Sequence, residues 1–175
     1  MKGPNIVETH LRLATSDDVA LIHDVALATW EPTYRDIVSQ EQIATMFEDL
    51  LSIPAITRQI EQNEGTYVLA LQGNTAVGFA YVSCSPDEPQ RYKLHRLYVR
   101  PTDQRSGAGR RLLEWVEQFV FDLGADELIL NVNRFNSAVD FYRKLGYETI
   151  DTVDVPYREY WLNDYVMRKQ KRRDS

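Results

Sequence analysis

Apolar residues recur at helical spacing in the first third of the chain. The polar–apolar pattern predicts a short strand over 8–13, followed by a helix that Thr15 or Ser16 caps and that runs to about residue 31. Ser39 and Gln42 have the spacing of a capping box and open a second helix. Pro54 favours the first turn of a third helix that ends near residue 63. One strand and three helices are therefore expected before the middle of the chain.

The spacing changes to strand-like runs after residue 65. Residues 66–83 form two such runs around the turn signal Gln72-Gly73-Asn74, and 93–99 make a further strand. A long amphipathic helix is expected over 107–122, with Gly124 in a left-handed cap. A strand over 127–132, a helix over 137–145 capped by Asn136 and ended by Gly146, and strands over 147–155 and 160–168 complete the order.

This order predicts an α+β fold, with a mixed, mostly antiparallel central sheet of about seven strands flanked by helices. The length fits one domain, which we place at residues 1–168. The basic run at 168–173, RKQKRR, has no apolar anchor, so residues 169–175 are expected to form a solvated tail.

Composition narrows the functional classes. The net charge of −6 argues against a nucleic-acid-binding protein and leaves room for a cationic substrate, although mild acidity also serves solubility. Cys84 is the single cysteine and the three histidines share no metal-binding spacing, so no disulfide or metal site is expected. The N-terminal residues lack the apolar run of a secretory signal, and no membrane span is visible. We therefore expect a cytoplasmic, soluble protein.

The segment 104–110 has the character of an anion-binding loop. It stands between an expected strand and the start of the long helix, where free backbone N–H groups and the helix dipole favour a phosphate. Gly107 and Gly109 let the main chain approach a ligand closely. An ordinary strand-to-helix turn is the alternative. A dinucleotide-binding fingerprint fits worse, because Leu112 stands where its third glycine belongs.

The string VRPTDQRSGAGRRLLEWV resembles the acetyl-CoA signature of the GNAT acetyltransferases, Gln/Arg-x-x-Gly-x-Gly/Ala, at every fixed position. The resemblance implies acetyl-CoA as the coenzyme. It also implies that backbone amides of the loop hold the pyrophosphate and that the preceding strand aligns the pantetheine. The residues implied for coenzyme binding are Leu97, Tyr98, Val99, Gln104, Arg105, Ser106, Gly107, Ala108, Gly109 and Arg110.

A second GNAT signature, an asparagine followed by an aromatic–tyrosine pair and Gly-Phe/Tyr, is matched by LNVNRFNSAVDFYRKLGYE at 130–148. The resemblance implies that Tyr142 assists departure of the CoA thiolate, and that Asn136 and Ala138 contact the coenzyme. A positioned phenol can stabilise a developing thiolate. A core tyrosine is the alternative for Tyr142, and capping alone also accounts for Asn136.

The acceptor amine must lose a proton, and His95 is one candidate base; a water relay is the other. In this superfamily the first helices and the last hairpin form the acceptor pocket. The resemblance places Trp30, Glu31, Tyr34 and Asp36 in it, with Glu48 and Asp49 nearby and Tyr157, Glu159 and Tyr160 opposite. Aromatic and acidic residues together suit a small amine such as a polyamine. The alternative for these acids is an exposed helix face.

The segment WEPTYRDIVSQEQIATMFEDL further resembles the bacterial spermidine/spermine (PaiA-like) branch. The resulting prediction is an N-acetyltransferase that moves acetyl from acetyl-CoA to a primary amine, such as spermidine, by direct attack in a ternary complex. An acetyltransferase for protein N-termini or lysines is the enzymatic alternative, and a CoA-binding regulatory domain without turnover is the alternative from another class. Both a monomer and a homodimer remain open.

Overall fold

The fold is described over residues 8–173 of a computed structural model. Residues 1–7, which entered the reading of the N-terminus, and the last two residues of the expected tail lie outside that range. The helices and strands are β1 Thr9–Leu13, α1 Val19–Tyr34, α2 Gln40–Leu51, α3 Ile53–Glu61, β2 Thr66–Gln72, β3 Thr75–Cys84, β4 Arg91–Val99, α4 Ala108–Asp122, β5 Glu127–Asn133, α5 Ala138–Lys144, β6 Glu148–Tyr157 and β7 Tyr160–Gln170.

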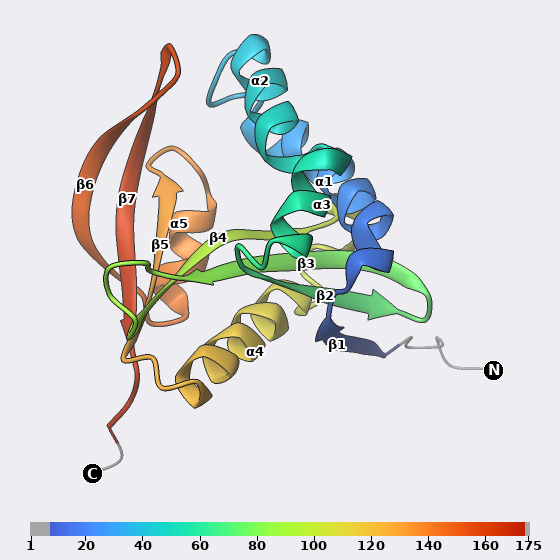
Figure 1. The fold of residues 1–175 in the computed structure, drawn as a ribbon. Coiled ribbons are helices and arrows are strands. Elements are labelled where there is room, and N and C mark those ends of the chain that lie inside the picture. The colour runs from blue at the N-terminus through green and yellow to red at the C-terminus, as the bar shows by residue number, and fades with distance from the viewer. Residues whose placement is uncertain (1–7, 174–175) are drawn as a thin grey trace, which may run out of the picture.

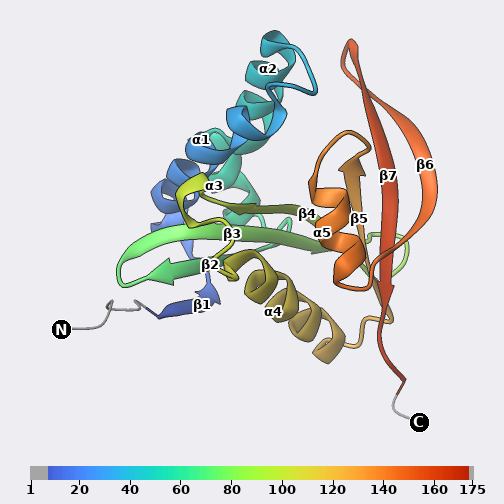
Figure 2. The same cartoon turned by 180° about the vertical axis from the view of Figure 1, so that it is seen from behind.

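The strands form one seven-stranded sheet in the order β1-β2-β3-β4-β5-β7-β6. Every neighbouring pair is antiparallel except β4 and β5, which run parallel and are connected through α4. The predicted α+β class and mixed, mostly antiparallel sheet are confirmed. Figures 1 and 2 show α1 and α3 on one face of β2 and β3, and α4 on the other.

Two apolar cores lie on opposite faces of this sheet. Leu69 of β2 and Phe79 of β3 pack under α1 and α3, whereas Val68 and Ala80 pack against α4. Because side chains alternate across a strand, both faces of β2 and β3 are buried. This double coverage explains why the two strands read as nearly continuous apolar runs.

The sheet opens between β4 and β5. Their parallel ladder ends at the pair Leu94 and Leu130, although β4 continues to pair with β3 and β5 with β7. In β4, Leu94 pairs with Val82 and Arg96 with Tyr81, so His95 is an extra residue at a bulge. Bulges bend a strand away from its neighbour. The bulge therefore lies where β4 leaves β5, and the facing edges of both strands beyond it are free of each other.

The bulge also reverses which residues of β4 face each core. Leu94, Leu97 and Val99 pack on the α4 side, whereas Tyr98 packs on the α1 side. In an unbroken strand Leu94 and Tyr98 would share a face. The one-residue insertion thus turns Tyr98 toward α1.

Helix α1 extends further than the sequence predicted. It continues through Pro32 to Tyr34, whereas the expected end was near residue 31. The capping box is formed by Thr15 and Asp18 and encloses a short 3-10 turn that precedes the helix. The ring of Tyr34 packs 4.6 Å from that of Trp30, one turn earlier. This packing accompanies continuation of the helix past a residue that normally ends one.

The expectation of a solvated tail from residue 169 is corrected for its first residues. Strand β7 continues to Gln170, and Lys169 Nζ lies 2.8 Å from Glu117 Oε2. Lys171 donates its backbone N–H to Asp126 O and its ammonium to Phe121 O. The ammonium groups of both lysines therefore have partners on α4, Glu117 for Lys169 and Phe121 O for Lys171. The basic composition of this segment gave no sign of these contacts.

Within residues 8–173, none of the helices combines the length and apolar character that crossing a membrane would require. The same residues hold no group of three or more His, Cys, Asp or Glu side chains placed to bind a metal ion.

Candidate active site

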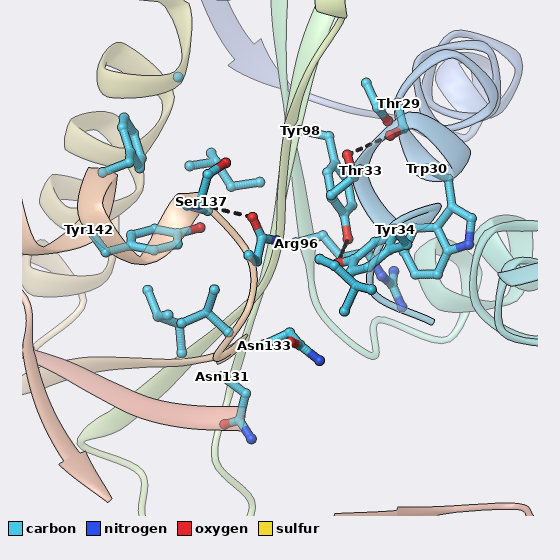
Figure 3. A pocket seen from close by; sticks show the side chains of 18 of the residues that line it. Thr29, Trp30, Thr33, Tyr34, Arg96, Tyr98, Asn131, Asn133, Ser137 and Tyr142 are labelled. Carbon is cyan, nitrogen blue, oxygen red and sulfur yellow. Dashed lines mark hydrogen bonds between the residues drawn. The ribbon is translucent and has the colours of Figure 1, made fainter. Parts of the chain in front are cut away.

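A cavity of about 1140 Å³ occupies the opening between β4 and β5. One wall comes from α1 and the start of α2, and the other from β5 and α5. Figure 3 shows these walls facing each other, with Tyr142 on one side and Tyr34 and Tyr98 on the other. The cavity extends from the loop before α4 to the turn that joins α1 and α2. It therefore connects the predicted coenzyme loop with the predicted acceptor residues.

The loop before α4 ends in a conformation that requires glycine. Gly107 is the N-cap of α4 with φ +86°, and a Cβ there would meet no protein atom within 4 Å. The N–H groups of Gly107, Gly109 and Arg110 donate to no acceptor among the described residues. Such free donors at the positive end of a 15-residue helix favour a bound anion. The open space above Gly107 fits a pyrophosphate.

The loop residues divide into those that face the cavity and those that shape the turn. Gln104, Arg105, Gly107, Gly109 and Arg110 line the cavity. Ser106 does not: its hydroxyl donates to Asp103 O at 2.5 Å and accepts from Ala108 N at 3.3 Å. Ala108 is buried in the core. The side chains of Ser106 and Ala108 therefore shape the turn, and the predicted role of their backbone amides toward a coenzyme stays a prediction.

The free edge of β4 supplies the next part of the cavity. Leu97, Tyr98 and Val99 line it, and none of them pairs with β5, because the ladder between the two strands stops at Leu94. Backbone groups on this edge have no strand partner and can bind an extended, amide-containing ligand as another strand would. On this edge Val99 O accepts a hydrogen bond from Gln104 Nε2 at 3.2 Å, and binding of a pantetheine chain here stays a prediction.

Tyr142 on α5 points its hydroxyl into the cavity (Figure 3). The residue is 7% exposed, and its ring packs against Phe141 and Tyr147. No described residue forms a hydrogen bond with the Tyr142 hydroxyl. Burial, together with nearby Tyr34, raises the pKa of this phenol above its ordinary value. The two alternatives for Tyr142 therefore combine: the ring belongs to the core, and the hydroxyl faces the ligand space.

Asn136 and Ala138 also line the cavity, at the start of α5. Asn136 Oδ1 accepts the N–H of Ala138 at 2.9 Å, which satisfies one free donor of the helix. The capping part of the interpretation is observed, one residue before the formal N-cap Ser137. The Asn136 residue also lines the cavity wall.

An aromatic group forms the opposite wall. The hydroxyls of Tyr34 and Tyr98 lie 3.1 Å apart, and the ring of Trp30 contacts both tyrosines. Burial raises the pKa of both phenols. The two tyrosines are therefore neutral at physiological pH and present hydroxyls and ring faces to a ligand.

His95, the extra residue of the β4 bulge, lies in the cavity wall with Nε2 2.7 Å from Ser83 Oγ. Although part of the residue is open to solvent, packing around the ring and the cations Lys93 and Arg96 lower its pKa to about 4. An imidazole of such low basicity is neutral at pH 7 and binds a proton weakly. The role of His95 as the base stays a prediction.

The predicted acidic residues do not gather on the cavity. Asp36 lines it, whereas Glu31 does not, and Glu31 lies 3.4 Å from Arg35 in an exposed ion pair. Asp49 accepts hydrogen bonds from Tyr157 and from Arg158, both at the turn between β6 and β7. The carboxylate of Asp49 therefore joins α2 to the hairpin and is occupied by the protein. For Glu31 the exposed-face alternative holds.

Several polar residues of the cavity wall escaped the sequence reading, among them Arg96, Asn131, Asn133 and Asp164. Asp164 is 9% exposed, and burial raises the pKa of its carboxyl. Asn131 and Asn133 belong to the edge of β5 that faces the opening (Figure 3). Polar residues at alternate positions of an otherwise apolar strand, as in LILNVN, were the available signal.

Comparison with known proteins identifies relatives of this chain. The GNAT acetyltransferase domain family matches residues 34–171. The spermidine N(1)-acetyltransferase of Thermoplasma acidophilum is 26% identical over 165 residues, covering 91% of this chain and 96% of that protein. The N-alpha-acetyltransferase RimI of Mycobacterium tuberculosis is 31% identical over 117 residues, covering 66% of this chain and 72% of the relative.

Among solved structures, the PaiA N-acetyltransferase of Thermoplasma acidophilum in complex with coenzyme A superimposes with a TM-score of 0.82. The two sequences are 24% identical, and the match covers 94% of this chain and 99% of that one. The superposition shows that the two proteins share a fold. The chain therefore belongs to the GNAT acetyltransferase family, whose N-acetyltransferases take their acetyl group from acetyl-CoA.

Proposed function

We propose that this enzyme acetylates a primary amine of a small aliphatic molecule, a polyamine such as spermidine. The loop at 104–110 holds the coenzyme pyrophosphate, and the free edge of β4 at Leu97 and Val99 aligns the pantetheine. Acetyl-CoA supplies an acetyl group activated as a thioester, with a thiolate as leaving group. The observation that carries the proposal is one continuous cavity, which connects the glycine loop to an aromatic pocket.

Tyr142 acts as the acid of the reaction in this proposal. Its hydroxyl has no partner among the described residues and faces the cavity, so its proton is available to a ligand atom. Because burial raises the pKa of Tyr142, the phenol is protonated throughout the neutral range. A protonated phenol can donate a hydrogen bond to developing negative charge on sulfur, an effect that contributes about 10²–10⁴-fold when proton transfer is involved.

Features of the acceptor end support an amine substrate. Trp30, Tyr34 and Tyr98 offer ring faces that attract a cation, and Asp36 and Asp164 are the carboxylates of that end. A polyamine carries further ammonium groups, which an exposed carboxylate such as Asp36 can attract in addition to the reacting nitrogen. The relative named as a spermidine acetyltransferase points to the same class of acceptor.

The experiment is a panel of amines assayed for CoA release, in which spermidine should give the highest kcat/KM. Asp36→Asn should raise the KM for spermidine, and the effect should shrink at high salt because exposed ion pairs are screened. Glu31→Gln is the matched control, since Glu31 belongs to the same helix end but not to the cavity. A panel in which no polyamine stimulates CoA release would refute the proposed acceptor class.

Acetylation of a protein N-terminus is the second candidate. It is favoured by the 31% identity to an N-alpha-acetyltransferase, which extends over 66% of this chain. Peptides with a free N-terminus therefore belong in the same panel. If such a peptide is acetylated and spermidine is not, this candidate replaces the polyamine.

A further inference from the structure

We infer that Asp164 receives the amino group of the acceptor and takes its proton. The inference rests on the acetylation of an amine proposed above, and it assigns a role to a residue that the coenzyme motifs do not include. Asp164 lies on β7, beside Asn133 of β5 and Val153 of β6. Its side chain lines the cavity at the opening between β4 and β5.

The Asp164 carboxylate lacks the partners that buried carboxylates normally have. The residue is 9% exposed. Among the described residues its carboxylate accepts one hydrogen bond, a long one of 3.4 Å from Asn131 Nδ2 to Oδ2. An ionised carboxylate offers about four acceptor positions. A buried charge is usually paired, because removing it from water is costly. Most of the acceptor capacity of Asp164 therefore has no partner among the described residues, in a residue that lines the cavity.

Neighbouring cations do not occupy the carboxylate. Lys93 of β4 and Arg134, the residue after β5, are close enough to lower its pKa, yet neither forms an ion pair with it among the described residues. Arg134 instead binds Asp154 on β6, at 2.7 Å. Asp154 also accepts a hydrogen bond from Asn163 and is exposed. Two aspartates on adjacent strands thus differ: Asp154 is neutralised by the protein, and Asp164 is not.

The position of Asp164 relative to Tyr142 suits a base and an acid that serve one reaction. Besides burial, the charge of Asp164 raises the pKa of Tyr34, and Tyr34 raises the pKa of Tyr142. All three line the same cavity, from β7, α1 and α5. An amine held between Asp164 and the aromatic wall would therefore face the space into which the Tyr142 hydroxyl points.

The chemistry required of Asp164 is a single proton transfer. An ammonium nitrogen gives one proton to the carboxylate, which leaves a neutral amine with a lone pair and a neutral carboxylic acid. Burial raises the pKa of Asp164 and so narrows the gap to the pKa of an alkylammonium. Before that transfer, the negative carboxylate attracts the positive ammonium and orients it. Later loss of the proton to water restores the carboxylate.

The test compares Asp164→Asn with Asp154→Asn. Asparagine keeps an oxygen that can accept from Asn131, so the substitution removes the charge and the base while retaining the structural contact. With an alkylammonium acceptor, Asp164→Asn should lower kcat/KM about 100-fold, and with a fluorinated alkylamine that is uncharged at neutral pH by less than about threefold. Asp154→Asn should leave both values unchanged.

Two measurements separate this role from a structural one. Calorimetry with the alkylammonium acceptor, in the absence of coenzyme, should show weaker binding to Asp164→Asn than to wild type. Thermal unfolding should show the variant to be at least as stable as wild type, because an uncompensated buried charge has been removed. Equal losses with charged and uncharged amines, or undiminished binding of the alkylammonium, would overturn the inference.

Failure of this inference is distinguishable from failure of the proposed function. If wild type acetylates no amine in the panel, the proposed function fails. If wild type acetylates an alkylamine and Asp164→Asn does so equally well, the function stands and Asp164 has no role as base.

Discussion

Two tyrosines of one core, Tyr142 and Tyr147, should respond to loss of their hydroxyls in opposite ways. Their rings lie 5.6 Å apart, and both residues are less than 10% exposed, with values of 7% and 3%. The Tyr142 hydroxyl faces the cavity without a partner among the described residues. The Tyr147 hydroxyl donates to Glu117 Oε1 at 3.0 Å, and Glu117 is itself buried and paired with Lys169. The pair therefore separates a chemical role from a structural one.

Tyr142→Phe removes no protein hydrogen bond, so Tm should stay within about 2 °C of wild type. The kcat should fall at least about tenfold, since general acid catalysis contributes about 10²–10⁴-fold. The KM for acetyl-CoA should change less than kcat. Tyr147→Phe leaves one oxygen of Glu117 without its donor, which costs about 1.5–3 kcal/mol for a charged partner. In a domain of this size that corresponds to a fall in Tm of about 3–12 °C.

The assay is CoA release measured with a thiol reagent, together with calorimetric unfolding of each variant. Tyr147→Phe should retain the wild-type kcat well below its lowered Tm. The reasoning fails if Tyr142→Phe turns over within about twofold of wild type at every pH, because a contributing acid is worth far more than that. It also fails if the two variants lose equal stability.

Three further predictions concern the loop, the bulge and the N-terminal cap. Gly107→Glu should raise the Kd for CoA at least about fivefold beyond Gly107→Ala, since like charges about 4 Å apart repel by about 1–4 kcal/mol and both variants share the backbone strain. Equal Kd values in calorimetry would remove the loop from the site. His95→Gln, which can keep the contact to Ser83, should leave the pH profile of kcat unchanged between about pH 6 and 9. Loss of one limb of that profile in the variant would identify His95 as the base. The hydrogen bonds from Arg12 lower the pKa of Asp18, so the stability they provide is present above the ordinary pKa of about 4 and is lost as pH falls through the lower folded value. Acid should therefore lower the Tm of wild type more than that of Asp18→Asn, and parallel Tm curves would contradict this.

Most elements were visible in the sequence because the signals for them are local. Ser39 accepts the N–H of Gln42 at the start of α2, and Gly124 and Gly146 have φ of +95° and +91° where caps were expected. The coenzyme motifs could be read for the same reason: a glycine that permits positive φ and a helix start with free N–H groups require only a few neighbouring residues. Helix caps and turns depend on residues that are close in the sequence, so the sequence pattern predicts them.

Helix α1 and strand β4 show where local rules were insufficient. A helix was expected to end before Pro32, yet it continues to Tyr34, whose ring packs on Trp30 of the same helix. The contact from another part of the fold is the Tyr98 hydroxyl on β4, which lies 3.1 Å from that of Tyr34. The extra residue in β4 leaves no mark in KLHRLYV, because pairing with β3 determines it. A shift of one residue places Tyr98 on the face of α1. Both deviations build the aromatic wall of the cavity.

The sequence by itself therefore determined most of the secondary structure, the fold class and the family motifs that contain the glycine loop and Tyr142. Only the tertiary structure decided which carboxylates reach the cavity. Glu31 and Asp49 looked suitable but are engaged by Arg35 and by the β6–β7 turn, whereas Asp164 was unremarked and is left without a cation. The physical reason is that a carboxylate is available to a ligand when no partner neutralises it, and its partners come from strands and helices distant in the chain.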